Sequence, residues 1–461
     1  MRRALGGGAL VAVLLVTALV AGCAPVAAGS DPVPSSQGAR PTPASSPTAT
    51  TAPSAAPSGT QPREVAYASA ELGFQGRWIV LDGAEEFNRR VDGFVRAQIE
   101  ADHPGFAARL PDAGGIAAGE LAEPALRIDG TVVQDRGTVL GVRLSARRED
   151  DVAWRTVFAN TRGGTWEGRD LLTEEARDAL TERVGAAALD GLSFDRDGGI
   201  EFGEGSAAGL SADEARAMLT DAGREVQAAA QGTAPFAGPE DGAAPHVPCT
   251  LIACVALTYD DGPDPVTTPQ LLDLLDAARV PATFFVEGRD AAAHPGIVRR
   301  AAAAGHAIEN HTWDHADLAL IPAEAVREQL AATDEAVVAA GVPAPTSVRA
   351  PYGSEGGAAR EAAGKPLIFW SVDSFDWESR DPAVFVPRVL DRIEPGGVVL
   401  MHDVHPSTIA GQQELIDTLR ERGYTFVTVP QLFAGIDLVA GEEYSCLGEG
   451  TGDTGRSCVM P

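Results

Sequence analysis

The second half of the chain alternates short apolar runs with helical patterns, and this alternation constrains the fold more than any other feature of the sequence. Apolar runs predict strands near 253–259, 282–286, 306–309, 367–371, 397–401 and 425–429. Apolar residues spaced three or four apart predict helices at 266–279, 290–304, 322–340, 381–393 and 408–422. Such an alternation favours an α/β fold with a parallel sheet, open or closed into a barrel, and with its chemistry at the carboxyl ends of the strands.

The N-terminus has the pattern of an export signal. Arg2 and Arg3 precede an apolar stretch at 9–20 that is short for a membrane span, and Val-Ala-Gly-Cys follows at 20–23. The pattern resembles a bacterial lipoprotein signal. The resemblance implies cleavage of residues 1–22 and a lipid on Cys23 that anchors the chain to the outer side of the cytoplasmic membrane. An ordinary secretory signal and an uncleaved anchor are the alternatives.

Composition divides the exported part into two expected domains joined by linkers. Residues 23–63 are almost wholly Pro, Ser, Thr, Ala and Gly, which predicts an extended linker, and a second linker is expected at 233–248. Between them, 64–232 predicts a smaller α+β domain, and 249–440 is the α/β domain, followed by a tail at 441–461.

The smaller domain shows no cluster of groups that would support catalysis. Its predicted helix spans Phe87 to Ile99, its strands lie at 131–133, 138–144 and 154–159, and further helical patterns lie at 172–189 and 212–230. Its acidic residues are scattered, as on a solvated surface. A wall-binding or spacer role is expected only from the position of the domain before the α/β domain.

Charge and cysteine content limit the environment and the partners. The 65 acidic residues against 36 basic ones give a net charge of −29, which disfavours nucleic acid and anionic membrane surfaces as electrostatic partners.

Apart from Cys23, the cysteines are Cys249, Cys254, Cys446 and Cys458. An even number in an exported chain favours disulfides, and sequence proximity favours pairing within 249–254 and within 446–458. A zinc site is the alternative, although neither pair has the CxxC spacing.

Two adjacent carboxylates, Asp260 and Asp261, end the first predicted strand of the α/β domain. Neighbouring side chains on a strand point to opposite sides, so one carboxylate can bind a metal while the other stays free as a base. An isolated Asp-Asp-Gly-Pro string would be a surface turn, and only the motifs that follow favour the functional interpretation.

Two histidines four residues apart, His311 and His315, follow the predicted strand at 306–309. On a helical turn such residues share a face, so both rings can reach one cation. With Asp261 they form a His, His, Asp set that leaves positions open for water and substrate, as in catalytic metal sites. A lone pair of histidines is more often exposed or capping.

Three further strings complete an ordered series: Arg349-Ala-Pro-Tyr352, Asp373-Ser-Phe-Asp376-Trp377 and Leu400-Met-His402-Asp403. With the two preceding motifs, they resemble the five motifs of the polysaccharide deacetylase family, also called carbohydrate esterase family 4. The resemblance covers most of residues 250–432 and implies a distorted (β/α) barrel. Tyr259 stands where the family often has Phe, which leaves both carboxylates in place.

The resemblance implies the chemistry of the main site. Asp261, His311 and His315 would hold a divalent ion, with zinc as the first expectation and cobalt, manganese or nickel also suited to nitrogen and oxygen ligands. Asp260 would be the base that deprotonates a water molecule, and His402 the acid that protonates the departing amine.

It also implies supporting roles. Arg349 would keep Asp260 ionised, and Asp376 would orient His402, with Asp373 as its rival. The backbone N–H of Tyr352 would stabilise the oxyanion. The expected substrate-binding residues are Pro351, Trp377 and Leu400, the last two lining the slot for the acetyl methyl group. For Leu400, a role in the core is the alternative. Three other histidines are expected to be structural or on the surface: His294, His306 and His405.

The expected function is removal of N-acetyl groups from an extracellular glycan. Peptidoglycan, at its N-acetylglucosamine or N-acetylmuramic acid residues, is the nearest such polymer to a membrane-tethered enzyme, and chitooligosaccharides or acetylated xylan are alternatives. A non-catalytic wall-binding lipoprotein would be expected to lack one of Asp260, His311 and His402. The acidic charge and the absence of a second metal cluster disfavour a secreted protease or nuclease. The oligomeric state is left open.

Overall fold

A computed structural model describes residues 61–461, apart from 109–120, 122, 150, 204–208, 240–243, 355, 449–452, 454, 457 and 460–461. The expected signal at 1–22, Cys23 and nearly all of the first expected linker lie outside the described residues. In the part that is described, no helix is both long enough and apolar enough to span a membrane.

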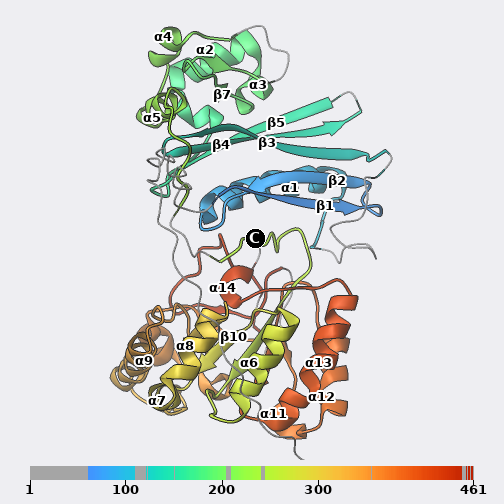
Figure 1. The fold of residues 1–461 in the computed structure, drawn as a ribbon, viewed down its shortest axis with the longest axis vertical. Coiled ribbons are helices and arrows are strands. Elements are labelled where there is room, and N and C mark those ends of the chain that lie inside the picture. The colour runs from blue at the N-terminus through green and yellow to red at the C-terminus, as the bar shows by residue number, and fades with distance from the viewer. Residues whose placement is uncertain are drawn as a thin grey trace, which may run out of the picture. The chain divides into compact units, whose positions relative to one another are not determined.

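The C-terminal region, residues 249–447, is built on a parallel sheet (Figure 1). Its strands lie in the order β11 (Ala307–Asn310), β10 (Thr283–Val286), β9 (Cys254–Asp260), β14 (Gly397–His402) and β13 (Val372–Asp373), and β15 (Thr425–Phe426) also pairs with β9. Because all these pairings are parallel, the carboxyl ends of β9, β10, β11 and β14 meet at one edge of the sheet. The predicted α/β class is confirmed.

Helices cover this sheet. They are α6 (Thr267–Ala278), α7 (Gly288–Ala293), α8 (Pro295–Ala303), α9 (Ala323–Ala339), α12 (Pro382–Arg392) and α13 (Pro406–Glu421). On β9, Val255, Leu257 and Tyr259 belong to one buried cluster, which also contains apolar residues of α6 and α13. Cys254 and Ala256, which alternate with them, belong to another buried cluster. Burial on both faces explains why this strand is mostly apolar from Cys254 to Tyr259.

The closed barrel is not confirmed. Single parallel bridges from Val348 to Asn310 and to Leu367 extend the sheet beyond β11 towards β12 (Leu367–Ile368), which pairs with β16 (Glu443–Tyr444). Among the described strands, no ladder joins β12 or β16 to β13 at the other end of the sheet. The barrel therefore stays a prediction.

Three elements of the structure differ in extent from the elements that the sequence predicts. The helix expected at 290–304 is divided into α7 and α8, because Pro295 starts a new helix after His294. The strand expected at 367–371 is two short strands, β12 and β13, with different partners. The strand expected at 425–429 ends at Phe426, and the side chain of Thr428 caps the short helix α14 (Val429–Leu432).

The N-terminal region, residues 63–236, contains a six-stranded sheet whose strands follow chain order. They are β1 (Arg63–Ser69), β2 (Phe74–Val80), β3 (Leu126–Arg136), β4 (Val139–Arg148), β5 (Asp151–Asn160) and β6 (Thr165–Glu167). Only β2 and β3 are parallel. The sequence predicts β3 to β5 but misses β1 and β2. That this region is a separate domain stays a prediction.

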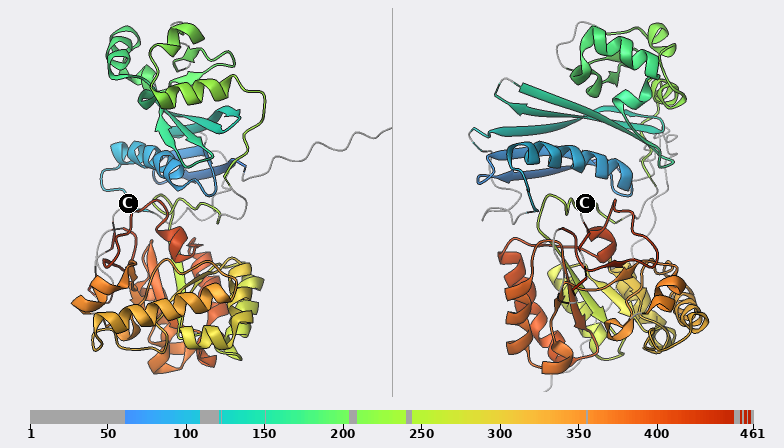
Figure 2. Two further views of the ribbon diagram at one scale, coloured as in Figure 1. Left: turned by 90° about the vertical axis from the view of Figure 1, so that its left-hand side faces the viewer. Right: turned by 180° about the vertical axis from the view of Figure 1, so that it is seen from behind.

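Helices pack on both faces of the N-terminal sheet (Figures 1 and 2). On one face lies α1 (Glu85–Asp102), which buries the apolar stripe that the sequence predicts from Phe87 to Ile99. The expected helices at 172–189 and 212–230 are each divided in two. They form α2 (Glu174–Val184), α3 (Ala186–Asp190), α4 (Ala212–Arg216) and α5 (Asp221–Ala230).

Disulfides join Cys249 to Cys254 and Cys446 to Cys458. These are the two pairs that sequence proximity favours. The first ties the start of β9 to the turn that precedes it, and Thr250 in that turn accepts a hydrogen bond from Nη1 of Arg96 at 2.9 Å.

Candidate metal and catalytic site

Most of the predicted site residues line one cavity of about 460 Å³ beside the carboxyl ends of the parallel strands. Asp260 ends β9 and His402 ends β14, and the register places the two directly opposite each other. His311 directly follows β11. The topology of the parallel sheet thus brings together residues that lie up to 142 positions apart in the chain.

The backbone around this cavity is locally strained. Asp261, His315, Tyr352 and Arg380, which line it, have φ values of 74°, 61°, 61° and 50°. Non-glycine residues seldom adopt positive φ, and where they do they cluster at functional sites. The strain supports a functional interpretation of the cavity.

Asp261, His311 and His315 offer ligand atoms that all lie within 4.8 Å of one another. Oδ1 of Asp261 lies 3.4 Å from Nε2 of His311 and 3.3 Å from Nε2 of His315. That Oδ1 is buried and has no hydrogen-bond partner among the described residues. One carboxylate and two imidazoles converging in this way fit a divalent cation, with further positions open towards the cavity.

A hydrogen bond sets the tautomer of the His311 ring. Its Nδ1 lies 2.8 Å from the carbonyl oxygen of Arg349, which can only accept, so Nδ1 carries a proton and Nε2 is the ring atom that could bind a cation. Desolvation, then the charge of the neighbouring His311, lowers the pKa of His315, which favours its neutral, ligating form. For Asp261, burial raises the pKa, but the interaction with the adjacent His311 outweighs burial, so the pKa lies well below its usual range.

The sequence predicts that the two histidines share a helical turn, and this prediction is wrong. His311 to His315 form a non-helical loop, with positive φ at Thr312 and at His315. The Asn310 side chain accepts from the Thr312 N–H at 2.8 Å, and the Gln329 side chain accepts from the Trp313 N–H at 2.7 Å. These contacts from side chains, rather than helical spacing, bring both rings to Asp261.

Asp260 is paired with Arg349. Nη1 of this fully buried arginine donates to Oδ1 of Asp260 at 2.8 Å and to Oγ1 of Thr258 at 2.7 Å. Its Nε and Nη2 donate to the carbonyl oxygens of Ile368 and Phe369, both at 3.0 Å. One carboxylate oxygen of Asp260 is therefore held by a cation, while the other lies 3.8 Å from Nε2 of His311.

His402 is paired with Asp376, whereas its expected rival Asp373 accepts from the Phe375 N–H instead. Asp376 is fully buried and also accepts from Thr408 at 2.5 Å. Burial lowers the pKa of His402, but the hydrogen bond and charge of Asp376 outweigh burial and raise that pKa to about 9. The ring is therefore protonated at neutral pH, with Nε2 left for the cavity.

The substrate-binding residues expected from the sequence are only partly at the cavity. Trp377 and Leu400 line it, as does Tyr352, while Pro351 is buried and is not among the lining residues. The role of Pro351 stays a prediction, and the structure places this buried residue at the start of a short 3₁₀ turn (Pro351–Gly353).

Sequence reasoning missed several lining residues. His405, expected to be structural or exposed, lines the cavity with its ring centroid 5.7 Å from that of His402. Trp370 and Arg380 also line it, although no motif singled them out. In the chain, Trp370 lies near Asp373, Arg380 near Trp377 and His405 near His402. This nearness to predicted site residues is the feature of the sequence that could have indicated them. His306 is buried, and its Nδ1 accepts from the Ala282 N–H at 3.1 Å, as expected of a structural residue.

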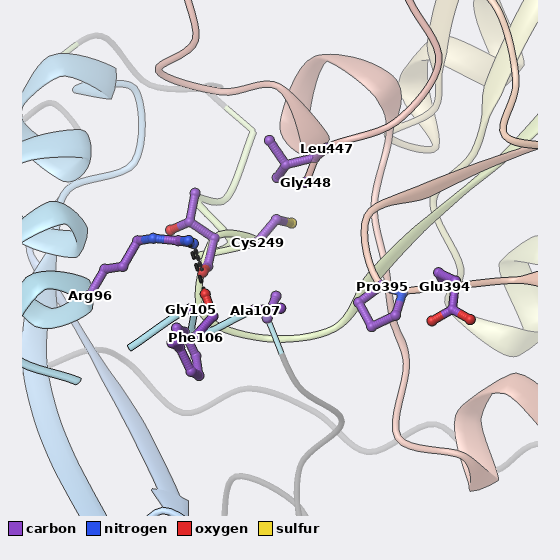
Figure 3. A pocket seen from close by; sticks show the side chains of 11 residues that line it. Arg96, Gly105, Phe106, Ala107, Cys249, Glu394, Pro395, Leu447 and Gly448 are labelled. Carbon is purple, nitrogen blue, oxygen red and sulfur yellow. Dashed lines mark hydrogen bonds between the residues drawn. The ribbon is translucent and has the colours of Figure 1, made fainter. Parts of the chain in front are cut away.

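A second hollow, of about 410 Å³, has a different character (Figure 3). Its lining includes Arg96, Phe106, Cys249 and Leu447 but no histidine, and its one carboxylate is that of Glu394. It offers neither a ligand set nor an acid and base pair.

Comparisons with known proteins agree with this geometry. Residues 249–365 match the family model described as polysaccharide deacetylase. The chain is 39% identical over 196 residues to a chitooligosaccharide deacetylase of Bradyrhizobium, covering 39% of this chain and 90% of that protein. It is 39% identical over 190 residues to a peptidoglycan-N-acetylglucosamine deacetylase of Listeria monocytogenes, covering 41% of each. It is 34% identical over 178 residues to a peptidoglycan-N-acetylmuramic acid deacetylase of Bacillus subtilis, covering 39% of this chain and 38% of that protein. The matches therefore span less than half of the Listeria and Bacillus relatives.

Proposed function

Because the chain belongs to the polysaccharide deacetylase family, we propose that it hydrolyses N-acetyl groups of an extracellular glycan and releases acetate. The observation that carries this proposal is that Asp260, His402 and the Asp261, His311, His315 set line one cavity. Arg349 and Asp376 are paired with Asp260 and His402, respectively. An amide needs an activated nucleophile on one side and a proton donor for the departing nitrogen on the other.

Asp261, His311 and His315 are the residues that would hold the divalent cation. When bound, such a cation supplies Lewis-acid polarisation of a carbonyl oxygen and lowers the pKa of a coordinated water towards about 7. The identity of the metal, with zinc as our first expectation, is part of the proposal.

The protein's own residues move the protons. Asp260, paired with Arg349, accepts a proton from the attacking water as the oxygen of that water bonds to the acetyl carbon. The backbone N–H of Tyr352 donates to the oxygen that becomes negative. Nε2 of His402 then donates a proton to the nitrogen as the carbon–nitrogen bond breaks, which yields acetate and a free amine.

Peptidoglycan is our proposed substrate, at N-acetylglucosamine or N-acetylmuramic acid residues. Two of the similar proteins are named for these two activities on peptidoglycan, which supports the class of polymer but does not choose the sugar. The similarity to a chitooligosaccharide deacetylase makes a soluble chitooligosaccharide the second candidate. A non-catalytic binding protein is disfavoured because every residue type that the chemistry needs is present.

The location of the protein outside the membrane and its domain organisation are also part of the proposal. A lipid on Cys23 would hold the chain outside the membrane, residues 23–63 would span the distance to the wall, and 64–232 would fold as an accessory domain. The C-terminal region would close into a distorted barrel of the family type.

The test uses the chain from residue 24 onward, without its signal. Incubation with purified peptidoglycan and, separately, with chitooligosaccharides is followed by measurement of released acetate and new amines. We expect acetate from peptidoglycan, loss of that activity on chelation, and its return with zinc or cobalt. Release from neither substrate, or full activity in metal-free protein, would contradict the proposal.

A further inference from the structure

The last part of the chain contacts two segments that line the catalytic cavity. We call it the C-terminal segment and define it by the residues of 441–459 that the structure describes, which are 441–448, 453, 455, 456, 458 and 459. None of the five sequence motifs lies in it, and the match to the family model ends at residue 365. The roles derived above therefore include none of its residues.

Backbone pairing and one disulfide attach the C-terminal segment to the parallel sheet. Its strand β16 pairs with β12, and the Leu447 N–H donates to the carbonyl oxygen of Gly396, directly before β14, at 3.0 Å. The disulfide between Cys446 and Cys458 closes the segment on itself, and the Val459 N–H donates to the carbonyl oxygen of Cys446 at 2.9 Å. Chain ends are poorly ordered unless they are tied down, so these contacts allow the segment to hold other residues in place.

Arg456 connects this segment to the turn that carries Tyr352. Its Nη2 donates to the carbonyl oxygen of Gly353 at 2.9 Å, and its Nε donates to Oε2 of Glu443 at 2.6 Å. Its guanidinium carbon lies 3.6 Å from the centroid of the Phe369 ring, and the side chain is 16% exposed. The carboxylate and the ring fix the direction of the guanidinium, so the donor that faces Gly353 has a defined position.

The turn that Arg456 contacts has a strained backbone. Tyr352 and Gly353 have φ values of 61° and 63°. A residue such as tyrosine keeps a positive φ only where its surroundings impose it. Tyr352 lines the cavity, and its ring centroid lies 4.5 Å from that of His315. The hydrogen bond from Arg456 to the Gly353 carbonyl oxygen fixes the peptide unit directly after this strained pair.

The C-terminal segment also contacts residues 371–373. The Asp453 N–H donates to the carbonyl oxygen of Ser371 at 2.9 Å, and the Asp373 N–H donates to Oδ2 of Asp453 at 3.2 Å. Arg388 and Arg392 of α12 pair with the same carboxylate at 3.3 Å and 3.1 Å. Asp373 lines the cavity, so the segment contacts a second part of the cavity lining.

We propose that Arg456 is a positioning residue that sets the place of the Tyr352 backbone N–H at the catalytic cavity. This inference rests on the proposed function, in which that N–H donates to the oxygen that becomes negative. Such a donor acts only at hydrogen-bond distance from the place that this oxygen will occupy, so a small displacement lowers the rate. Arg456 touches no reacting atom and acts through the turn alone.

Arg456→Gln tests the proposal in the chain from residue 24 onward, with acetate release from chitotetraose as the assay. The kcat should fall roughly tenfold, less than the 10²–10³ that follows complete loss of an oxyanion donor. KM should change little, because the donor binds the negative oxygen more strongly than the carbonyl of the substrate. Metal content should equal that of the parent. Arg456→Lys keeps a charged donor and should recover part of the kcat.

Hydrogen–deuterium exchange provides a measurement that does not depend on turnover. The peptide containing residues 350–354 should exchange faster in Arg456→Gln than in the parent, while peptides from β9 and β14 should be unchanged, because only the local contact is lost. Cys446→Ser/Cys458→Ser keeps Arg456 but opens the closed loop of the C-terminal segment. It should produce the same pattern to a smaller extent.

Arg300→Gln is the matched control. Like Arg456, Arg300 pairs with carboxylates, here those of Asp273 and Asp276, and its Nη1 donates to a backbone carbonyl oxygen, that of Pro269, at 3.3 Å. Arg300 is not among the residues that line the catalytic cavity. Its substitution should leave both the kcat and the exchange of residues 350–354 as in the parent.

Two results would overturn the proposal: parental kcat in Arg456→Gln, or parental exchange of residues 350–354 in that variant. Equal losses in the Arg456 and Arg300 variants would overturn it as well, because the effect would then be one of general stability. If the parent releases no acetate from any glycan but exchange of residues 350–354 still rises in Arg456→Gln, then the proposed function fails while the contact of Arg456 with the turn stands.

Discussion

The ring Nδ1 and the backbone N–H of His402 both donate to the carboxylate of Asp376, at 2.8 Å and 2.9 Å. Because ring and backbone are held together, the imidazole cannot turn away without breaking a hydrogen bond to a buried carboxylate. The same contact supplies the charge that outweighs burial and raises the pKa of His402 to about 9. Orientation and protonation of this ring therefore depend on one residue.

Asp376→Asn should shift the alkaline limit of activity. A proton donor works only below its pKa, so activity of the parent on an amide should be lost as pH rises through about 9. Removing the anion lowers the pKa of His402, so this loss should occur at lower pH in the variant. The measurement is kcat/KM against pH, with Asp373→Asn as the matched control. A shift in the Asp373 variant and none in the Asp376 variant would exchange their roles.

Arg349→Met should destabilise the fold strongly. Arg349 is fully buried and Asp260 is 3% exposed, so loss of the cation leaves a buried carboxylate unpaired, at a typical cost of about 3–5 kcal/mol. The free energy of unfolding in urea measures this cost. Asp260→Asn/Arg349→Met removes the stranded charge as well and should recover part of the loss. Strictly additive effects of the two substitutions would show that the pair is not coupled.

The positions of the strand-terminal residues were predictable from the sequence. The apolar run of β9 ends at Asp260 and that of β14 at His402, and parallel strands bring their carboxyl ends to one edge. Their placement at the same edge of the sheet therefore follows from secondary structure, whereas the pairing of β9 with β14, which makes them neighbours, is seen only in the structure. The ordered motifs then identified the partners Arg349 and Asp376, which the structure places in contact with them.

The loops at the cavity were not predictable in the same way. His315 and Arg380 reach the cavity through positive φ values, and neither position carries the glycine or asparagine that would indicate such a conformation. The strand β2 was missed because Gly76 interrupts its apolar pattern.

A Cβ at Gly76 would lie 2.7 Å from the Phe74 side chain, so close packing requires a glycine at a position where the sequence pattern argues against a strand.

Cys23→Ala tests the anchor expected from the sequence. Without the thiol, no lipid can be attached, so the protein should appear in the culture medium or keep its signal. Cell fractionation and the mass of the N-terminal peptide distinguish these outcomes. Unchanged membrane retention and unchanged processing would count against lipidation.

Separate substitutions of Asp260 and Asp261 should have different effects on metal content. Asp261 contributes the buried oxygen that lies between the two histidines, so Asp261→Asn should lower metal affinity, and excess metal should partly restore turnover. Asp260 is held by Arg349 instead, so Asp260→Asn should keep the metal near one per chain. Its rate should still fall by about 10²–10⁴, the usual effect of losing a general base.

His402→Ala completes this comparison, because it should keep its metal and lose the proton donor instead of the base. Its defect should be large on an acetamide and smaller on an activated acetate ester, whose leaving group departs without a proton. Asp260→Asn should be impaired on both substrates, since both need an activated water. Metal stoichiometry and rates on amide and ester for the three variants are the measurements. Should Asp260→Asn be purified metal-free while Asp261→Asn remains loaded, the roles of the two carboxylates must be exchanged.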